Sequence, residues 1–424
     1  MKQIAVIGLG YVGLPLAKLF ASRYAVTAYD HDPERISALL AGKDKNRQFS
    51  PEELKAVQSV TKSKQGVYFT ENADDLDGCD IFIVTVPTPV DIHNKPNISL
   101  LIEATELIAA KLPKNGLVIY ESTVYPGCTE ESCVTVLEKI SGMKLNSGFY
   151  VGYSPERINP GDTERRIENI VKVTSGSSPE AAEMVDELYR SVITAGTHLA
   201  PSIKVAEAAK VIENSQRDIN IAFVNELAKI FSLMQIDTNE VLNAAATKWN
   251  FLPFRPGLVG GHCIGVDPYY LAQKATEFAY HPEIILAGRR MNDSMGYYVA
   301  SECVKTMLQQ GITVSGSSVL VMGITFKENC PDIRNSKVND VIKNLKEYGC
   351  SVDVYDPVAE PDETEAEYHI QLIPQLTEKK YDAVIFAVAH HDFKKLDPEN
   401  LVTETGVIFD VKGIFPKNTR IKRL

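Results

Sequence analysis

The chain has 424 residues, of which 44% are hydrophobic and 23% charged, so it is long enough for two or three globular domains with their own cores. Its net charge of -11 argues against a nucleic-acid partner, because proteins that bind nucleic acids usually present a basic face. No stretch reaches the roughly 20 apolar residues of a membrane span and no signal peptide is visible, so we expect a cytoplasmic protein without membrane contacts.

The N-terminal region alternates strand and helix patterns. Residues 2–7 predict a buried strand, residues 11–22 a helix and residues 25–29 a second strand. Apolar runs at 81–86, 117–120 and 150–152 follow, separated by helical patterns at 100–111 and 130–140. This alternation predicts a parallel, doubly wound sheet that binds its ligands at the carboxyl ends of the strands.

The middle third has only helical patterns. Residues 201–235 contain no interior Gly or Pro, and at about 1.5 Å per residue they predict a helix of roughly 50 Å that links domains. Further helical patterns occupy residues 237–249, 268–278 and 282–310. We therefore expect a central helical domain.

The last third returns to alternating elements, with strands predicted at 318–323, 352–355, 382–388 and 407–410 and a helix at 335–348. The segments VLVMG and VDVYDP repeat the AVIG and VTAYDHDP of the N-terminal region, but Ile-Thr-Phe-Lys follows Gly323 in place of further glycines. The predicted fold class is α/β: two Rossmann-like doubly wound domains, 1–200 and 313–424, joined by a central helical domain, 201–312, with one long helix.

A dinucleotide motif lies between the first strand and the first helix. Gly8 permits the tight turn, Gly10 allows close approach of a pyrophosphate, and Gly13 allows the helix to pack against the strand. Asp30, 22 residues after Gly8, can accept hydrogen bonds from a ribose 2′-hydroxyl and repel a 2′-phosphate. The motif predicts NAD in preference to NADP. Thr123 follows a later strand, where its hydroxyl can face the nicotinamide half or simply belong to a turn.

A glycine-rich loop at residues 254–267 carries Cys263 between His262 and Asp267, just before a predicted helix. A thiol near a helix N-terminus can have a lowered pKa and act as a nucleophile. The chain has seven scattered cysteines and no CxxC pair, which predicts a reducing compartment and no metal site. Residue chemistry alone leaves Cys263 open as a nucleophile or a buried structural thiol.

Seven motifs in order, GLGYVGLPLA, VPTP, YESTVYPG, YSPERINPGD, KVAEAAKVIENSQRDINIAFVNELA, GLVGGHCIGVDPYYL and GITFKENCPDIRNS, span nearly the whole chain. With these motifs the chain resembles the UDP-glucose/GDP-mannose dehydrogenase family. His262, where UDP-glucose members usually carry Ser, together with ESTVYPGCTEE and KWNFLPFRPGLVGGHC, is similar to the Vi-antigen-type UDP-N-acetylglucosamine and UDP-N-acetylgalactosamine 6-dehydrogenases.

The resemblance implies an NAD-dependent four-electron oxidation of a sugar C6 hydroxymethyl group to a uronic acid, which supplies surface polysaccharide synthesis. Cys263 matches the nucleophile that forms a thiohemiacetal and then a thioester. Lys210 matches the lysine that acts with water on the substrate hydroxyl, Asp267 the carboxylate paired with it, and Glu156 the residue that helps activate water. Two further residues match the catalytic set, Asn214 and Thr123.

The resemblance also implies ligand contacts. The cofactor-binding set is Gly8, Gly10, Tyr11, Val12, Gly13, Asp30, Arg35, Thr88, Thr123 and Arg334. The substrate-binding set is Arg157, Ile158, Lys210, Asn214, Arg217, Gly260, Phe326, Lys327 and Lys412, the last three from the domain expected to hold UDP. Spacings of four and three residues place Lys210, Asn214 and Arg217 on one helix face, which without the resemblance could be a solvated polar stripe.

Several alternatives stay open. The substrate could be UDP-glucose or UDP-N-acetylmannosamine, and a two-electron dehydrogenase of the 6-phosphogluconate or 3-hydroxyacid kind would share the architecture without needing Cys263. A third possibility is a sensor that keeps the fold without turnover. The family implies a homodimer about the long helix, or a higher homo-oligomer. The sequence leaves open which C4 epimer is used and whether a partner's arginine, such as Arg255, closes the site.

Overall fold

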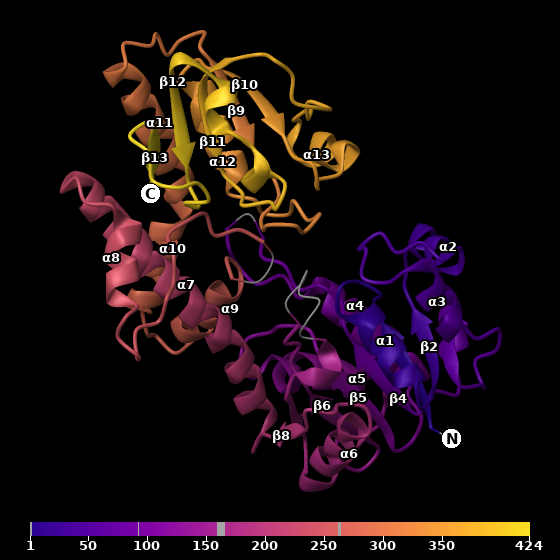
Figure 1. Cartoon of the computed structure of the whole chain (residues 1–424). Helices are drawn as coiled ribbons and strands as arrows, with labels where there is room; N and C mark the ends of the chain where they lie inside the picture. Colours follow the sequence, from indigo (N-terminus) through magenta and orange to yellow (C-terminus); the bar gives the residue numbers. More distant parts are fainter. Residues whose placement is uncertain (1, 92, 159–165, 262–263) are drawn as a thin grey trace. The chain divides into compact units, whose positions relative to one another are not determined.

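The computed structural model describes residues 2–91, 93–158, 166–261 and 264–424 (Figure 1). The chain forms two compact units, Met1–Glu213 with Tyr269–Tyr280 and Asn214–Pro268 with His281–Leu424. Helix α7 (Ile203–Leu233) begins in the first unit and ends in the second. Each unit contains one parallel or mostly parallel sheet, as the alternating patterns at the two ends of the sequence predict.

In the described part of the first unit the sheet has the strand order β3-β2-β1-β4-β5-β6-β7-β8. Neighbouring strands are parallel except for β6 and β7, which are antiparallel. The strands are β1 (Gln3–Ile7), β2 (Ala25–Tyr29), β3 (Gly66–Thr70), β4 (Ile81–Val84), β5 (Gly116–Tyr120), β6 (Phe149–Tyr153), β7 (Lys172–Gly176) and β8 (Thr197–Leu199). The predicted doubly wound sheet is confirmed, and β3, β7 and β8 extend it.

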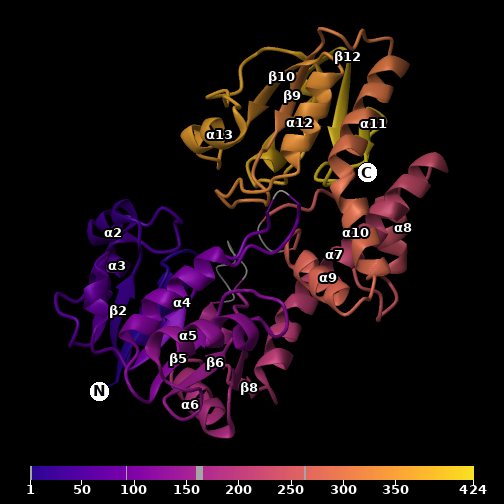
Figure 2. The same cartoon turned by 180° about the vertical axis from the view of Figure 1, so that it is seen from behind.

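Helices cover both faces of this sheet. Because successive strand residues face opposite sides, Ile4 and Val6 pack into one core and Ala5 and Ile7 into the other. The first core includes residues of α1 (Gly13–Ala21), α2 (Pro33–Leu40), α3 (Pro51–Val57) and α6 (Pro179–Arg190). The second includes α4 (Ser99–Lys111), α5 (Val134–Ser141) and the start of α7, and α4 and α5 lie side by side (Figure 2).

Helix α7 buries an unusual number of polar side chains beside apolar ones such as Val211 and Val224. Polar residues form its buried stripe: Glu207, Lys210, Asn214, Asp218 and Asn225. Apolar residues lie exposed along it: Val205, Ile212, Phe223, Ile230 and Leu233. The buried polar groups have partners; the Glu207 carboxylate, for example, accepts hydrogen bonds from the Gly127 and Thr129 backbone N–H groups. Burial raises the pKa of Glu207 to about 7.

The helical region of the second unit differs in one place from the sequence expectation. It contains α8 (Thr238–Ala245), and the continuous pattern at 282–310 forms two helices, α10 (Glu283–Asp293) and α11 (Met295–Gln309). The break falls at Ser294, which donates its backbone N–H to the carbonyls of both Arg290 and Met291. Helix α9 (Asp267–Glu277) crosses from the second unit to the first.

A second sheet, with the order β10-β9-β11-β12-β13 and parallel neighbours, lies in the second unit. Its strands are β9 (Ser318–Met322), β10 (Ser351–Tyr355), β11 (Tyr381–Phe386), β12 (Val402–Asp410) and β13 (Ile421–Arg423). Residues of α11 and α12 (Val338–Glu347) fill the core on one face, whereas Phe393 and Phe415 pack on the other. Helix α13 (Pro361–Tyr368) follows β10.

The two sheets share one turn geometry, which confirms the internal repeat. The Leu9 N–H donates to Asp30 Oδ2 at 2.7 Å, and the Ile324 N–H donates to Asp356 Oδ2 at 2.7 Å. In the second copy, however, Asp356 also accepts hydrogen bonds from three more backbone N–H groups and lies 3.1 Å from His390 Nε2. Burial alone would raise the pKa of Asp356, but these partners hold it below its ordinary value.

A buried polar cluster holds α7 against α10. Arg289 Nη1 lies 2.6 Å from Asp218 Oδ1, and Asn292 Nδ2 donates to the same oxygen at 2.7 Å. Asn225 pairs with Asn292 and forms two hydrogen bonds with the backbone of Gly257. The cluster therefore fixes both the helix packing and the start of the glycine-rich loop.

We predict that Arg289→Met lowers the free energy of unfolding by about 3–5 kcal/mol at pH 7, because it leaves the buried Asp218 carboxylate without its cation. Burial already raises the pKa of Asp218, so the loss should shrink toward pH 5, where protonation removes the unpaired charge. Urea unfolding measures both effects. The control is Arg290→Met at the exposed neighbouring position, and equal losses for the two variants would contradict the prediction.

Candidate active site

The turn between β1 and α1 requires glycine at two positions. Gly8 has a φ of +90°, which side chains rarely adopt, and a Cβ at position 13 would lie 1.8 Å from the Gly8 carbonyl oxygen. A Cβ at Gly10, by contrast, would meet no described atom within 4 Å, so the space beside Gly10 is open to a ligand. Among the described residues, no side chain caps α1 at Val12. The positive end of the α1 dipole therefore faces the open space beside Gly10, where phosphate oxygens can bind.

Asp30 and Arg35 both bind the backbone of this turn. Asp30 accepts the Leu9 N–H, and Arg35 donates to the Leu9 carbonyl oxygen through Nε at 3.0 Å and Nη2 at 2.9 Å. Arg35 also pairs with the buried Asp44 at 3.0 Å, which balances its charge. The buried Arg35 Nη1 has no hydrogen-bond partner among the described atoms. These residues fit a dinucleotide: a glycine cradle, a carboxylate at the end of β2 and an unused buried donor.

The predicted threonines meet at the carboxyl edge of the sheet. Thr88 Oγ1 donates to the Thr123 carbonyl oxygen at 2.6 Å, and the Tyr270 hydroxyl donates to the Thr88 carbonyl oxygen at 2.7 Å. Sequence reasoning missed Thr85, whose hydroxyl donates to the Gly8 carbonyl oxygen at 2.7 Å and secures the glycine turn. The sequence offered one signal for Thr85: it directly follows the apolar run of β4, the strand beside β1. The Tyr11 carbonyl oxygen accepts a hydrogen bond from Gln48 Nε2.

Glu156 lies just beyond the carboxyl end of β6 and is buried. Its Oε1 accepts the backbone N–H groups of Arg157 and Ile158. Its Oε2 is buried without a hydrogen-bond partner among the described atoms, and the nearest cation is Lys172 Nζ at 3.8 Å. A buried carboxylate oxygen with an unused lone pair can accept a proton from water or substrate, so the geometry suits the role implied for Glu156.

Arg157 and Lys210 also belong to the first unit. Arg157 forms an ion pair with Glu213 of α7, and half-buried Ile158 packs against the core beneath α1 and α6. Lys210, one turn before Glu213, is only 7% exposed and pairs with no carboxylate in the described residues. A buried ammonium without a fixed counter-ion is able to exchange protons with a ligand.

In the second unit Asn214 and Asp267 form a direct pair. Asn214 Nδ2 donates to Asp267 Oδ2 at 2.5 Å, and both side chains are buried. Asp267 is the first residue of α9, where the helix dipole favours a negative charge. Arg217, expected on the same helix face as Lys210 and Asn214, is exposed. Only Lys210 and Asn214 of the three predicted residues are buried.

The glycine-rich loop packs directly on residues predicted to bind substrate. A Cβ at Gly260 would lie 3.3 Å from Phe326 Cβ, and one at Gly257 would lie 3.0 Å from Lys412 Nζ. Lys327 is half-buried beside Phe326, and its carbonyl oxygen accepts the Thr325 hydroxyl at 3.0 Å. The structure therefore gathers Gly260, Phe326 and Lys412 in one place, as a shared substrate site requires.

Other predicted residues have different surroundings. Arg334, expected to contact the cofactor, pairs with Asp332 at 2.6 Å within the second unit. Arg255 donates to Asn239 and Asn243 of its own chain. His262 and Cys263 lie outside the described residues. The six described cysteines, Cys79, Cys128, Cys133, Cys303, Cys330 and Cys350, are all buried and free, as expected for structural thiols.

Two further classes of feature are absent from the part of the chain that the structure describes. It contains no group of three or more His, Cys, Asp or Glu side chains arranged to hold a metal ion. None of its helices combines the length and the apolar character needed to cross a membrane.

Comparison with known proteins agrees with this geometry. Residues 2–193, 204–294 and 320–417 match the NAD binding, central and UDP binding domains of the UDP-glucose/GDP-mannose dehydrogenase family. The chain is 55% identical over its whole length to 99% of a UDP-N-acetyl-D-glucosamine 6-dehydrogenase from Pseudomonas aeruginosa, and 51% identical to 98% of one from Salmonella typhi. The structure of a UDP-D-ManNAc dehydrogenase from Pyrococcus horikoshii superposes with a TM-score of 0.90 at 30% identity, covering 100% of this chain and 99% of the other. The chain thus belongs to the UDP-glucose/GDP-mannose dehydrogenase family.

Proposed function

We propose that this NAD-dependent enzyme oxidises the C6 hydroxymethyl group of a UDP-N-acetylhexosamine, UDP-N-acetylglucosamine or its galacto epimer, to the uronic acid through a thioester on Cys263. The observation that carries the proposal is full-length identity above 50% to two UDP-N-acetyl-D-glucosamine 6-dehydrogenases, in a chain that keeps the glycine cradle and the buried Glu156. Residues 1–200 would bind NAD, 201–312 would supply the catalytic loop, and 313–424 would bind the UDP-sugar.

Each catalytic residue has a defined task in this proposal. NAD, when bound at the glycine cradle, accepts hydride. Lys210 and a water held with Asn214 and Asp267 take the proton from the C6 hydroxyl and stabilise the oxyanion. The Cys263 thiolate adds to the aldehyde carbon to give a thiohemiacetal. This becomes a thioester when its hydroxyl gives up a proton and its carbon gives up a second hydride, for which a second NAD would be the acceptor. Water then adds to the thioester carbonyl while Glu156 accepts its proton, and the C–S bond breaks.

The choice of an N-acetyl sugar rests on His262 and on the relatives. UDP-glucose and UDP-N-acetylmannosamine are the alternative substrates, and the structural relative from Pyrococcus horikoshii at 30% identity is a dehydrogenase of the second. The product would enter surface polysaccharide synthesis in the cytoplasm.

The exposed apolar side chains of α7 support a homodimer about this helix. Phe223 is 54% exposed and Leu233 is 87% exposed, although both are apolar. Exposed apolar side chains along one helix are usually covered by a partner. A second copy of the chain is the partner that the family resemblance favours, and a higher homo-oligomer would use the same surface.

We predict that NAD is strongly preferred over NADP, because the Asp30 carboxylate would face the additional phosphate. Asp30→Ala should raise the KM for NAD and lower the ratio of kcat/KM with NAD to kcat/KM with NADP. Glu34→Ala, an exposed carboxylate on the neighbouring helix α2, is the matched control. Comparable efficiency of the unmodified enzyme with both cofactors would contradict the prediction.

A panel of UDP-sugars assayed with NAD tests the substrate. We expect the highest kcat/KM with UDP-N-acetylglucosamine or UDP-N-acetylgalactosamine. Glucose lacks the acetamido group, and polar groups built to bind such a group are left unpaired when it is missing. If UDP-glucose or UDP-N-acetylmannosamine gave the highest value, the substrate assignment would be wrong while the family would stand.

The yield of NADH per limiting UDP-sugar tests the thioester route. We expect two NADH and a uronic acid with no released aldehyde, and Cys263→Ala should abolish carboxylate formation. Lys210→Ala should slow the reaction by about 10²–10⁴-fold without removing the covalent step. One NADH with an aldehyde or ketone product would instead indicate the two-electron alternative.

A further inference from the structure

A buried charged network lies behind Glu156. Lys172 Nζ is 2.6 Å from Glu121 Oε2 and 3.8 Å from Glu156 Oε2, and the Tyr189 hydroxyl donates to Glu121 Oε1. The side chains of Lys172 and Glu121 are 3% and 0% exposed. Neither residue belongs to the catalytic or ligand-binding sets considered above.

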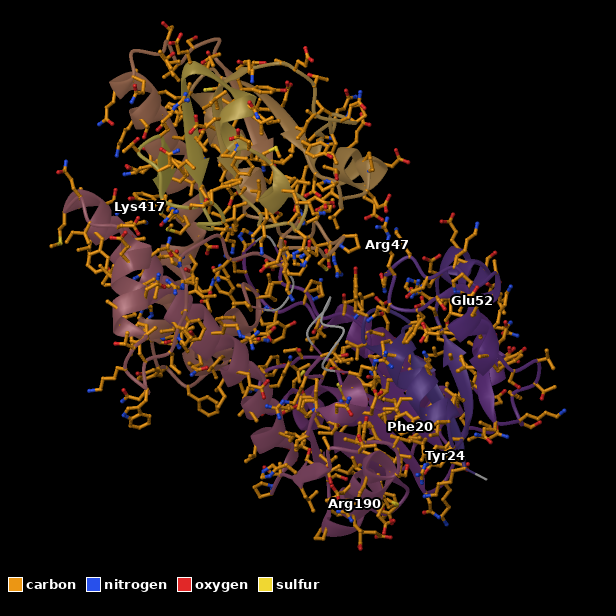
Figure 3. The ribbon with its side chains drawn as sticks, in the orientation of Figure 1. Phe20, Tyr24, Arg47, Glu52, Arg190 and Lys417 are labelled. Carbon is orange, nitrogen blue, oxygen red and sulfur yellow. The ribbon has the colours of Figure 1, made fainter. Side chains whose placement is uncertain are left out.

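The sheet topology places these groups together. Glu121 follows β5 and Glu156 follows β6, so both lie at the carboxyl edge where ligands bind. Because β7 is antiparallel to β6, its first residue, Lys172, lies at that same edge. The Tyr189 ring from α6 lies 5.2 Å from Lys172 Nζ and packs against Phe20, which Figure 3 labels, with ring centroids 5.5 Å apart.

The network holds two carboxylates and one ammonium. Burial raises the pKa of Glu121, although Lys172 and Tyr189 act in the opposite direction. Among the residues that the structure describes, two other charged pairs on these elements already have partners: Asp186 with Arg190, which Figure 3 also labels, and Arg157 with Glu213. Lys172 is therefore the cation that both Glu121 and Glu156 share, and the unpartnered Oε2 of Glu156 faces it.

We propose that Lys172, held by Glu121 and Tyr189, is a positioning residue that keeps Glu156 ionised and its Oε2 ready to take a proton from the hydrolytic water. The proposal rests on the proposed thioester route. In that step the water oxygen bonds to the thioester carbon, the water proton passes to Glu156 Oε2, the C–S bond breaks, and the sulfur leaves as the thiolate. A protonated Glu156 could not accept the proton, and the acyl-enzyme would accumulate.

Three variants separate positioning from a structural role. Lys172→Met removes the shared cation. Glu121→Gln/Lys172→Met removes the same cation without leaving Glu121 buried and charged, so it serves if the single variant does not fold. Glu121→Gln alone removes the competing carboxylate and leaves Lys172 entirely to Glu156. The control is Thr174→Val, which removes a buried hydrogen bond to Asp186 from the same strand.

The measurement is the rate of acyl-enzyme hydrolysis in single turnovers from pH 5 to 9, followed by acid quenching and intact-protein mass. Lys172→Met removes the cation that favours the carboxylate form of Glu156, so this variant should shift the acid limb upward by about one pH unit or more. The double variant also removes the competing Glu121 carboxylate, so its upward shift should be smaller. At the lower pH values hydrolysis should then slow about tenfold, and acyl-enzyme should accumulate. Glu121→Gln should shift the limb downward, and Thr174→Val should not shift it.

An unchanged acid limb in the Met variants, or in Glu121→Gln, would overturn the positioning role while leaving the thioester route intact. If the unmodified enzyme forms no acyl-enzyme and releases an aldehyde, the proposed function itself fails, and the role of Lys172 fails with it. Tight binding of NADH and UDP-sugar by each variant, measured by calorimetry, confirms that the site is folded.

Discussion

The polar buried stripe of α7 is the constraint on which the rest of the structure depends. A helix can bury Glu207, Asn214, Asp218 and Asn225 only if each of these side chains finds partners, because an unpaired buried charge or amide costs several kcal/mol. The partners come from separate parts of the chain: the loop after β5, the start of α9, α10 and the glycine-rich loop. Within the first unit the helix thereby fixes the loop after β5, and within the second unit it fixes the start of α9, α10 and the glycine-rich loop.

The carboxyl edge of the first sheet concentrates the chemistry. Four strands end there in polar groups: β1 in the glycine turn, β4 in the segment with Thr85 and Thr88, β5 in Glu121 and Thr123, and β6 in Glu156. Parallel strands make this possible because their carboxyl ends share one edge. The antiparallel β7 adds Lys172 from the opposite chain direction, so one reversed strand contributes a cation to an edge otherwise occupied by hydroxyls and carboxylates.

Much of this fold could be predicted from sequence because strands and helices differ in period and the glycines have fixed meanings. Residues 25–29 match β2, and the long helix predicted at 201–235 is Ile203–Leu233. The strands β3, β7, β8 and β13 were not predicted. Three of them, β3, β8 and β13, lie at sheet edges, and β7 has the sequence KVTSG with one large apolar residue. The ion pair of Lys172 and Glu121 was also not predicted from the sequence. Its members are 51 residues apart, and only the strand order brings them into contact.

The exposed position of Arg217 has a similar cause. Helical spacing places it near the face of Lys210 and Asn214, but spacing does not say how wide the covered part of a helix is. Likewise, the pattern at 282–310 predicts one helix, because the break at Ser294 does not interrupt the helical spacing of the apolar residues.

The second copy of the turn has consequences for the history of the molecule. Asp356 accepts hydrogen bonds from four backbone N–H groups and lies against His390. The positions equivalent to Gly10 and Gly13 hold Thr325 and Glu328. If the two sheets descend from one duplicated ancestor, this copy lost the ability to bind a dinucleotide at this turn through several coupled changes. If only the glycines were restored, the Asp356 oxygens would still be occupied by hydrogen bonds and could not accept those of a ribose hydroxyl. Single reversions would therefore not restore dinucleotide binding.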